Sequence, residues 1–135
     1  MEELNLELGQ IFWLIIPLLN KSSKYIRPFL VYEINGEDYI FLKISSTPKD
    51  HIPQFPLIKR PSSFYREKSF VELNIFVFIK KHKTFSHILN KTTRPIEQGQ
   101  HILEEDFSKI VEEVNSCFKS NDEKYWGNRY KIRVE

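Results

Sequence analysis

"RPFLVYEINGEDYIFLKISS", residues 27–46, is the stretch that decides the fold of this chain. Apolar, β-branched and aromatic residues fill both of its halves, and such residues favour extended strands. Asn35-Gly36 at its centre is the strongest short signal for a hairpin, because a type I′ turn needs positive φ at two successive residues. Pro28 lacks an amide donor and suits the first residue of a strand. The stretch therefore predicts an antiparallel β-hairpin.

Two more strands are predicted on either side of this hairpin. Residues 10–19 are almost wholly apolar and stop at Pro17 and a polar run, which is typical of a buried strand. Residues 69–81 form a strand that is long enough to bend around a barrel. Residues 84–89 after it fit either a short strand or a helical turn.

The region between the hairpin and the long strand is predicted to be irregular. Residues 47–68 contain four prolines, and residues 55–59 within them fit a short strand. A loop this long in a compact domain is either a binding element or a plain connector. The sequence leaves both readings open.

Residues 102–118 predict an amphipathic helix. Three acidic residues crowd its first turn, where they suit the positive end of the helix dipole. Its apolar residues recur with the 3.6-residue spacing of one helix face. These are Phe107, Ile110, Val111, Val114 and Phe118.

Together the elements predict a single domain over residues 1–135 that is mainly β with one or two helices. Strongly curved strands and few helices favour a small, partly open antiparallel β-barrel.

Composition excludes several classes of function. There is one cysteine, Cys117, so an internal disulfide and a thiolate zinc site are both excluded within one chain. No histidine pair has the i, i+4 spacing of a metal site, and no phosphate-binding glycine loop is present. The apolar run at residues 11–19 is too short to span a bilayer and has no basic residue before it. We therefore expect a cytoplasmic protein without membrane, metal or cofactor.

Arg27 is the first candidate for chemistry. It opens the hairpin, and the opposite strand ends in Ser45, Ser46 and Thr47. Antiparallel pairing brings residue 27 roughly opposite residues 44–46. A guanidinium fork and hydroxyl donors suit the non-bridging oxygens of a phosphodiester. RNA carries its own nucleophile, the 2′-hydroxyl, so such a site needs no metal.

Basic and aromatic residues elsewhere are candidates for binding RNA. Residues 129–135 alternate as a half-buried strand does, with a basic outer face that includes Arg133. Such residues track a phosphate backbone and stack on bases, although they also fit a solvated edge and a buried core. The candidates are Lys24, Lys43, Lys80, Lys81, Lys83, Tyr125, Trp126, Arg129 and Lys131.

The order of these pieces resembles the PemK/MazF family, the mRNA-cleaving toxins of type II toxin–antitoxin systems. Five pieces carry the resemblance over about residues 8–118, and an extra strand at about residues 128–135 follows them. They are "GQIFWL" from Gly9, "RPFLV" from Arg27, "ISST" from Ile44, "SFV" from Ser69 and the helix with "EEDFSKIVEEV".

The resemblance implies a CcdB/PemK/MazF-type barrel that forms a homodimer and binds a cognate antitoxin. It implies metal-independent cleavage of single-stranded RNA to a 2′,3′-cyclic phosphate and a 5′-hydroxyl. Arg27 would stabilise the phosphorane and shuttle a proton, and Ser46 or its neighbours Ser45 and Thr47 would hold the phosphate.

This chain departs from the family after the "SFV" piece. Some members carry a second catalytic arginine there, whereas this chain reads "ELNIFVF", in which Asn74 is the polar residue kept. A non-catalytic barrel that binds RNA or a protein is therefore the alternative, and a phage- or plasmid-borne module that pairs through its edge strand is another.

Overall fold

The computed structural model describes residues 5–17, 24–50, 52–57, 69–88, 99–119 and 130–134. The elements in chain order are β1 (Gln10–Pro17), β2 (Lys24–Asn35), β3 (Asp38–Ser45), β4 (Gln54–Pro56), β5 (Phe70–Lys80), α1 (Lys81–His87), β6 (Gln100–His101), α2 (Glu104–Lys119) and β7 (Tyr130–Val134). The strands predicted near both ends of the chain and the helix predicted at residues 102–118 are confirmed. The short strand predicted at residues 55–59 starts one residue earlier, and residues 58 and 59 lie outside the described part.

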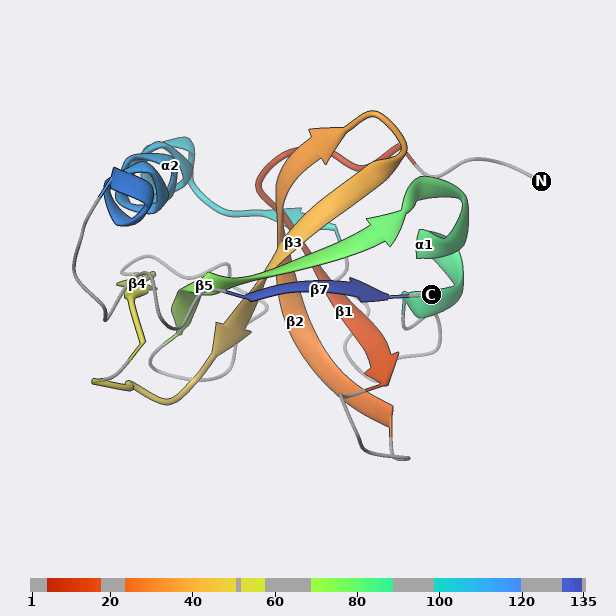
Figure 1. Ribbon diagram of the computed structural model, residues 1–135, viewed down its shortest axis with the longest axis horizontal. Coiled ribbons are helices and arrows are strands. Elements are labelled where there is room, and N and C mark those ends of the chain that lie inside the picture. The colour runs from red at the N-terminus through yellow and green to blue at the C-terminus, as the bar shows by residue number, and fades with distance from the viewer. Residues whose placement is uncertain are drawn as a thin grey trace.

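The strands form one sheet that curls strongly into an open half-barrel (Figure 1). Its order is β4-β5-β3-β2-β1-β6, and β7 also pairs with β5. β4 and β7 share one edge of β5, because β4 pairs with its first residues and β7 with its second half. All these pairings are antiparallel except β5–β7, which is parallel. The predicted mainly β, partly open barrel is confirmed.

The hairpin of β2 and β3 is present, but its turn lies one residue later than predicted. Asn35 pairs with Asp38, so Gly36 and Glu37 form the two-residue turn, and Gly36 has a positive φ of 51°. Moving the turn by one residue shifts the pairing by two residues, so the side chains next to the turn keep their faces. The bulge between Val31 and Glu33 then shifts the pairing by one residue and places Phe41 opposite Val31 on the inner face.

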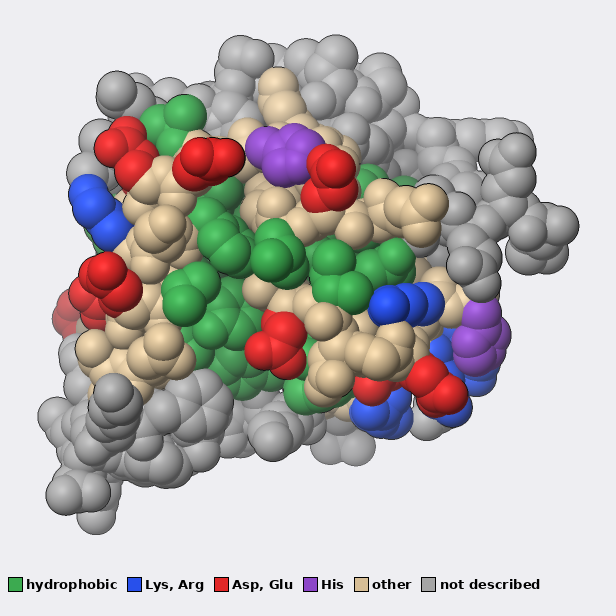
Figure 2. Space-filling view, turned by 90° about the horizontal axis from the view of Figure 1, so that it is seen from above, with side chains coloured by type: hydrophobic (Ala, Val, Ile, Leu, Met, Phe, Trp, Pro, Cys, Tyr) green, Lys and Arg blue, Asp and Glu red, His purple; other side chains and the backbone are tan. Residues whose placement is uncertain are grey.

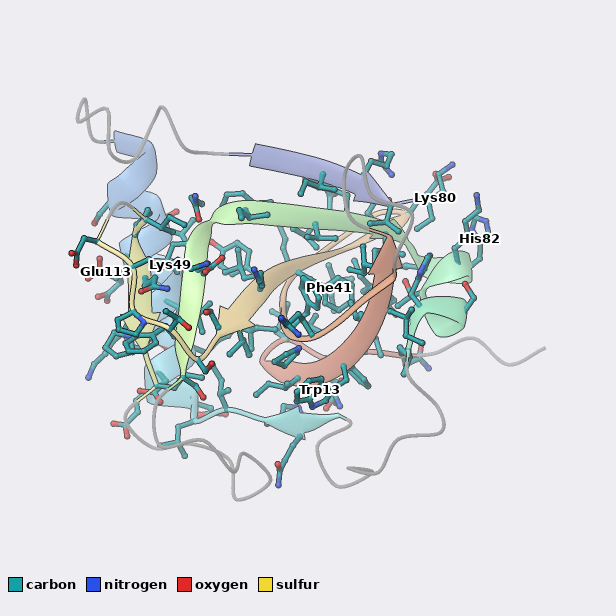
Figure 3. The ribbon with its side chains drawn as sticks, turned by 90° about the horizontal axis from the view of Figure 1, so that it is seen from below. Trp13, Phe41, Lys49, Lys80, His82 and Glu113 are labelled. Carbon is teal, nitrogen blue, oxygen red and sulfur yellow. The ribbon has the colours of Figure 1, made fainter. Side chains whose placement is uncertain are left out.

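The inner face of the sheet, inside the curl, is the first of two cores. Phe41 lies there with no exposed surface, and its ring meets those of Phe29 and Tyr39 edge-on (Figure 3). Residues from β1, β2, β3, β5 and β7 surround it, and Ile88 bridges to Leu14 of β1. The other core lies on the outer face, where α2 packs Ile110 and Val114 against the sheet.

The basic segment after β5 differs from its prediction. Lys81 was predicted to be the last residue of the strand over residues 69–81, whereas it begins α1 together with His82 and Lys83. The Lys81 N–H donates to the carbonyl oxygen of Glu37 at 2.7 Å, and the Thr84 hydroxyl donates to that of Lys80 at 2.9 Å. These bonds end the strand and start the helix. Within the described residues, neither helix has the length and apolar surface needed to cross a membrane.

The C-terminal strand is tied to the hairpin turn by an ion pair. Arg133 of β7 donates to both carboxylate oxygens of Asp38, at 3.0 and 3.1 Å. This hydrogen bond is the main reason that the pKa of Asp38 lies below its ordinary value, and the positive charge of Lys80 acts in the same direction. The contact links β7 to β3 across the end of β5.

Substituting Arg133 with methionine should lower the free energy of unfolding by up to about 1 kcal/mol near neutral pH. Because the pKa of Asp38 is lower in the folded state, this stabilisation is full above the unfolded pKa of about 4 and is lost as the pH falls through the folded pKa. Urea denaturation at pH 7 and at pH 2 should therefore show the difference only at pH 7. Lys109→Met, the same charge change on exposed α2, is the control, and a difference that persists at pH 2 would contradict the assignment.

Candidate functional site

The inner face changes from apolar to polar at one end, and it does so on three neighbouring strands. On β3, Tyr39 and Phe41 are followed on the same face by Lys43 and Ser45. On β2, Arg27 comes two residues before Phe29 and lies on the same face. On β5 the inner-facing residue at this end is Glu72, because Val71 and Leu73 on either side of it face the other core. Lys49 from the loop after β3 reaches Glu72. We call Arg27, Lys43, Ser45, Lys49 and Glu72 the polar end.

Arg27 and the hydroxyl residues lie at this end without being direct partners in the sheet. The pairing of β2 with β3 ends at Phe29 and Lys43, two residues before Arg27 on one strand and before Ser45 on the other. Beyond that point Arg27 pairs with Leu14 of β1, and Ser45 pairs with Phe70 of β5. The strands therefore splay apart here and leave the mouth of the curl between them.

The three hydroxyls have different surroundings. Ser45 Oγ accepts a hydrogen bond from the Thr47 N–H at 3.1 Å and lies 3.5 Å from the Thr47 carbonyl oxygen. It holds the turn that leaves β3. Ser46 and Thr47 are exposed, so their hydroxyls are the ones presented to a ligand.

Glu72 is a site residue that the sequence analysis missed. Its side chain has no exposed surface. Lys49 Nζ donates to Glu72 Oε2 at 2.9 Å, and Lys43 Nζ lies 4.0 Å from Glu72 Oε1. Asn74 two residues later is also buried. Lys43 and Lys49 thus carry two positive charges against the buried carboxylate of Glu72, while the carboxylates of Asp50 and Glu113 line the pocket beside Lys49.

The loop after β3 is held in place by hydrogen bonds. The Lys49 N–H donates to Gln54 Oε1 at 2.9 Å, and Gln54 Nε2 donates to the Thr47 carbonyl oxygen at 3.1 Å. Gln54 itself pairs with Glu72 through β4. The residues that carry the exposed hydroxyls are thus fastened to the same strand as the buried carboxylate.

An open pocket of about 390 Å³ lies beside this loop. Phe70 and Leu73 of β5 supply apolar surface to it, and Lys49 and Gln54 supply polar groups. Glu113 of α2 also lines the pocket, and Figure 3 shows it next to Lys49. The lining is mainly polar and includes the carboxylates of Asp50 and Glu113.

The other residues predicted to bind RNA do not gather at the polar end. Lys80 pairs with Asp38 beside the hairpin turn, at the opposite end of β5 from Phe70, and Lys81 and Lys83 follow it in α1. Figure 3 shows Lys80 far from Lys49. Lys24 and Lys131 lie on β2 and β7, where the structure describes only their backbone. Tyr125, Trp126 and Arg129 lie outside the described residues.

The described histidines have local roles. His87 Nδ1 lies 3.1 Å from the Ile15 carbonyl oxygen, and His101 Nε2 lies 2.9 Å from Glu7 Oε1. Among residues 5–17, 24–50, 52–57, 69–88, 99–119 and 130–134, no three His, Cys, Asp or Glu side chains gather in a group that could hold a metal ion.

Comparison with known proteins adds no family assignment. No protein-family model matches the chain, and no curated protein matches it significantly.

Proposed function

We propose that this chain is a divergent endoribonuclease toxin of the PemK/MazF type, which cleaves single-stranded RNA without a metal. The observation that carries the proposal is that Lys43 and Lys49 lie against one buried carboxylate next to the exposed residues Ser46 and Thr47. Arg27 lies towards the same end of the hairpin, on the strand that pairs with β1 there. The order of the five sequence pieces supports it independently.

The reaction needs charge stabilisation more than it needs a nucleophile from the protein. The RNA 2′-oxygen forms a new bond to phosphorus and loses its proton, while the bond from phosphorus to the 5′-oxygen breaks and that oxygen gains a proton. The Arg27 guanidinium grips the non-bridging oxygens bidentately and stabilises the charge that builds there. Ser46 and Thr47 donate hydrogen bonds to the same phosphate. The products are a 2′,3′-cyclic phosphate and a 5′-hydroxyl.

A toxin of this kind requires a partner that blocks it. We expect a cognate antitoxin to cover Arg27 with an acidic or aromatic segment, and we expect the toxin to act as a homodimer in the cytoplasm. The charge of the polar end would favour the acidic segment.

Incubation of the pure chain with mixed RNA in EDTA should produce discrete fragments with 2′,3′-cyclic phosphate ends. Chelation should not slow the reaction, because the substrate supplies the nucleophile and Arg27 supplies the positive charge. The same preparation of an Arg27→Ala variant controls for a contaminating nuclease. RNA that stays intact with the normal chain would end the proposal.

A non-catalytic binding role is the second candidate, and Glu72 is the observation that favours it. This chain lacks the second arginine that some members of the family use, and the same segment carries Glu72, a buried carboxylate that cannot stabilise a negative transition state. A gel shift with single-stranded RNA without any cleavage would select this role.

A further inference from the structure

Glu72 is not explained by the reaction proposed for Arg27. An ionised carboxylate without exposed surface is costly unless opposite charges and hydrogen bonds compensate it. Lys49 supplies a hydrogen bond of 2.9 Å, and Lys43 supplies a second positive charge at 4.0 Å. The carboxylate therefore has a defined pair of partners from two different segments of the chain.

The three side chains differ in their access to solvent. The Lys43 and Lys49 side chains are 21% and 28% exposed, whereas Glu72 is fully covered. A ligand that approaches the mouth of the curl can touch the exposed parts of both lysine side chains and cannot touch the carboxylate. Glu72 supplies one negative charge to the two lysines, and Asp50 and Glu113 line the pocket on which Lys49 borders.

Glu72 also fixes where Lys49 stands. The backbone of Lys49 is held by Gln54, the β4 residue that pairs with Glu72, and its ammonium group is held by Glu72 itself. A lysine held at both ends loses less conformational entropy when it binds a ligand than a free surface lysine does.

We propose that Glu72 is a positioning residue that holds Lys43 and Lys49 together as a binding site for a backbone phosphate of single-stranded RNA. The identity of the ligand rests on the proposed function. The site lies beside the loop that carries Ser46 and Thr47, which is held to β4 and β5 through Gln54.

Binding to an uncleavable probe separates this site from the reaction. We would use a fluorescent single-stranded 2′-O-methyl RNA of mixed sequence and measure anisotropy over a range of salt concentrations. Lys43→Met and Lys49→Met should each weaken binding about tenfold, as expected for one lost charge-assisted contact. Each should also make the slope of the logarithm of the association constant against the logarithm of the salt concentration less steep by about 0.7. Lys49→Arg keeps the positive charge and should keep most of the salt dependence of the normal chain. Lys109→Met removes the same charge from an exposed position of α2 and is the control.

Glu72→Gln gives the decisive test because two explanations predict opposite signs. If Glu72 only adds negative charge to the surface, its removal should strengthen RNA binding, as Glu112→Gln on α2 should do slightly. If Glu72 positions the lysines, its removal should weaken binding about fivefold or more, although the net charge becomes more positive. A far-ultraviolet circular dichroism spectrum shows whether the variant is folded.

The outcomes distinguish the two proposals. Weaker binding by Lys43→Met, Lys49→Met and a folded Glu72→Gln supports the phosphate site, even if the normal chain never cleaves RNA. Lysine variants that bind like Lys109→Met, or a folded Glu72→Gln that binds more tightly, overturn the site and leave cleavage by Arg27 untouched. If Glu72→Gln does not fold, the salt dependence of RNA binding by Lys43→Met and Lys49→Met decides whether the phosphate site exists. A normal chain that binds an acidic peptide and no RNA overturns the site.

Discussion

Replacing Arg27 with alanine should lower the rate of RNA cleavage about a thousandfold. The guanidinium is the group that we expect to meet the charge that builds on the phosphate during the reaction. Its side chain is exposed on β2, whose backbone continues to pair with β1 on both sides of it. The substitution should therefore leave the fold unchanged. Single-turnover cleavage of a short RNA measures the chemical step directly.

Arg27→Lys is the matched variant for this prediction. It keeps the charge and loses the planar fork that grips two oxygens at once, so its rate should fall between those of the normal chain and Arg27→Ala. In cells, induction of the normal chain should arrest growth and induction of Arg27→Ala should not. Equal rates for all three proteins would place the reaction, if any, elsewhere in the molecule.

Replacing Phe41 with alanine should have the largest effect on stability. Phe41 has no exposed surface at the centre of the inner face, and its ring contacts two other aromatic rings. Truncation of such a residue costs about 3–5 kcal/mol, because the cavity that it leaves closes only in part. A domain of this size has about 5–15 kcal/mol in total, so the variant should be close to unfolding.

Urea denaturation followed by tryptophan fluorescence measures the loss. Phe41→Leu keeps most of the volume and should lose clearly less than Phe41→Ala. Similar, small losses in both variants would mean that the curl tolerates a gap at its centre and that the inner face is not a close-packed core.

Much of the fold was predictable because local signals and burial agree. The hairpin has a glycine at its turn and apolar residues on both strands, and α2 has one clear apolar face. Where the local turn signal and the pairing of the strands disagreed, the predicted position of the hairpin turn was wrong by one residue. The dipeptide Asn35-Gly36 marked the turn, but a bulge between Val31 and Glu33 and the burial of Phe41 set the register.

The site was predictable only in part. The hairpin pairing predicted that Arg27 would lie opposite residues 44–46, but this pairing stops at Phe29 and Lys43, and Arg27 and Ser45 then pair with different strands. Glu72 was hidden, because one acidic residue in an alternating strand looks like a solvent-facing position. Its burial depends on Lys49, which comes from the loop after β3, and no local pattern links the two.

The described part of the chain also exposes a few large hydrophobic side chains. Leu8, Ile34 and Leu103 are the large hydrophobic residues that stay exposed in the described part of the chain. Figure 2 shows apolar side chains in the centre of one face with acidic, basic and histidine side chains around them. A few exposed large hydrophobic residues are normal for a folded domain.

The parallel pairing of β7 has a consequence for synthesis on the ribosome. β5 is made well before β7, since α1, β6 and α2 come between them in the chain. Until β7 arrives, the second half of β5 presents a row of unpaired amide and carbonyl groups beside Ile75 and Val77. A nascent chain in this state is open to pairing with a second nascent chain, and slow translation of the intervening segment would lengthen that exposure.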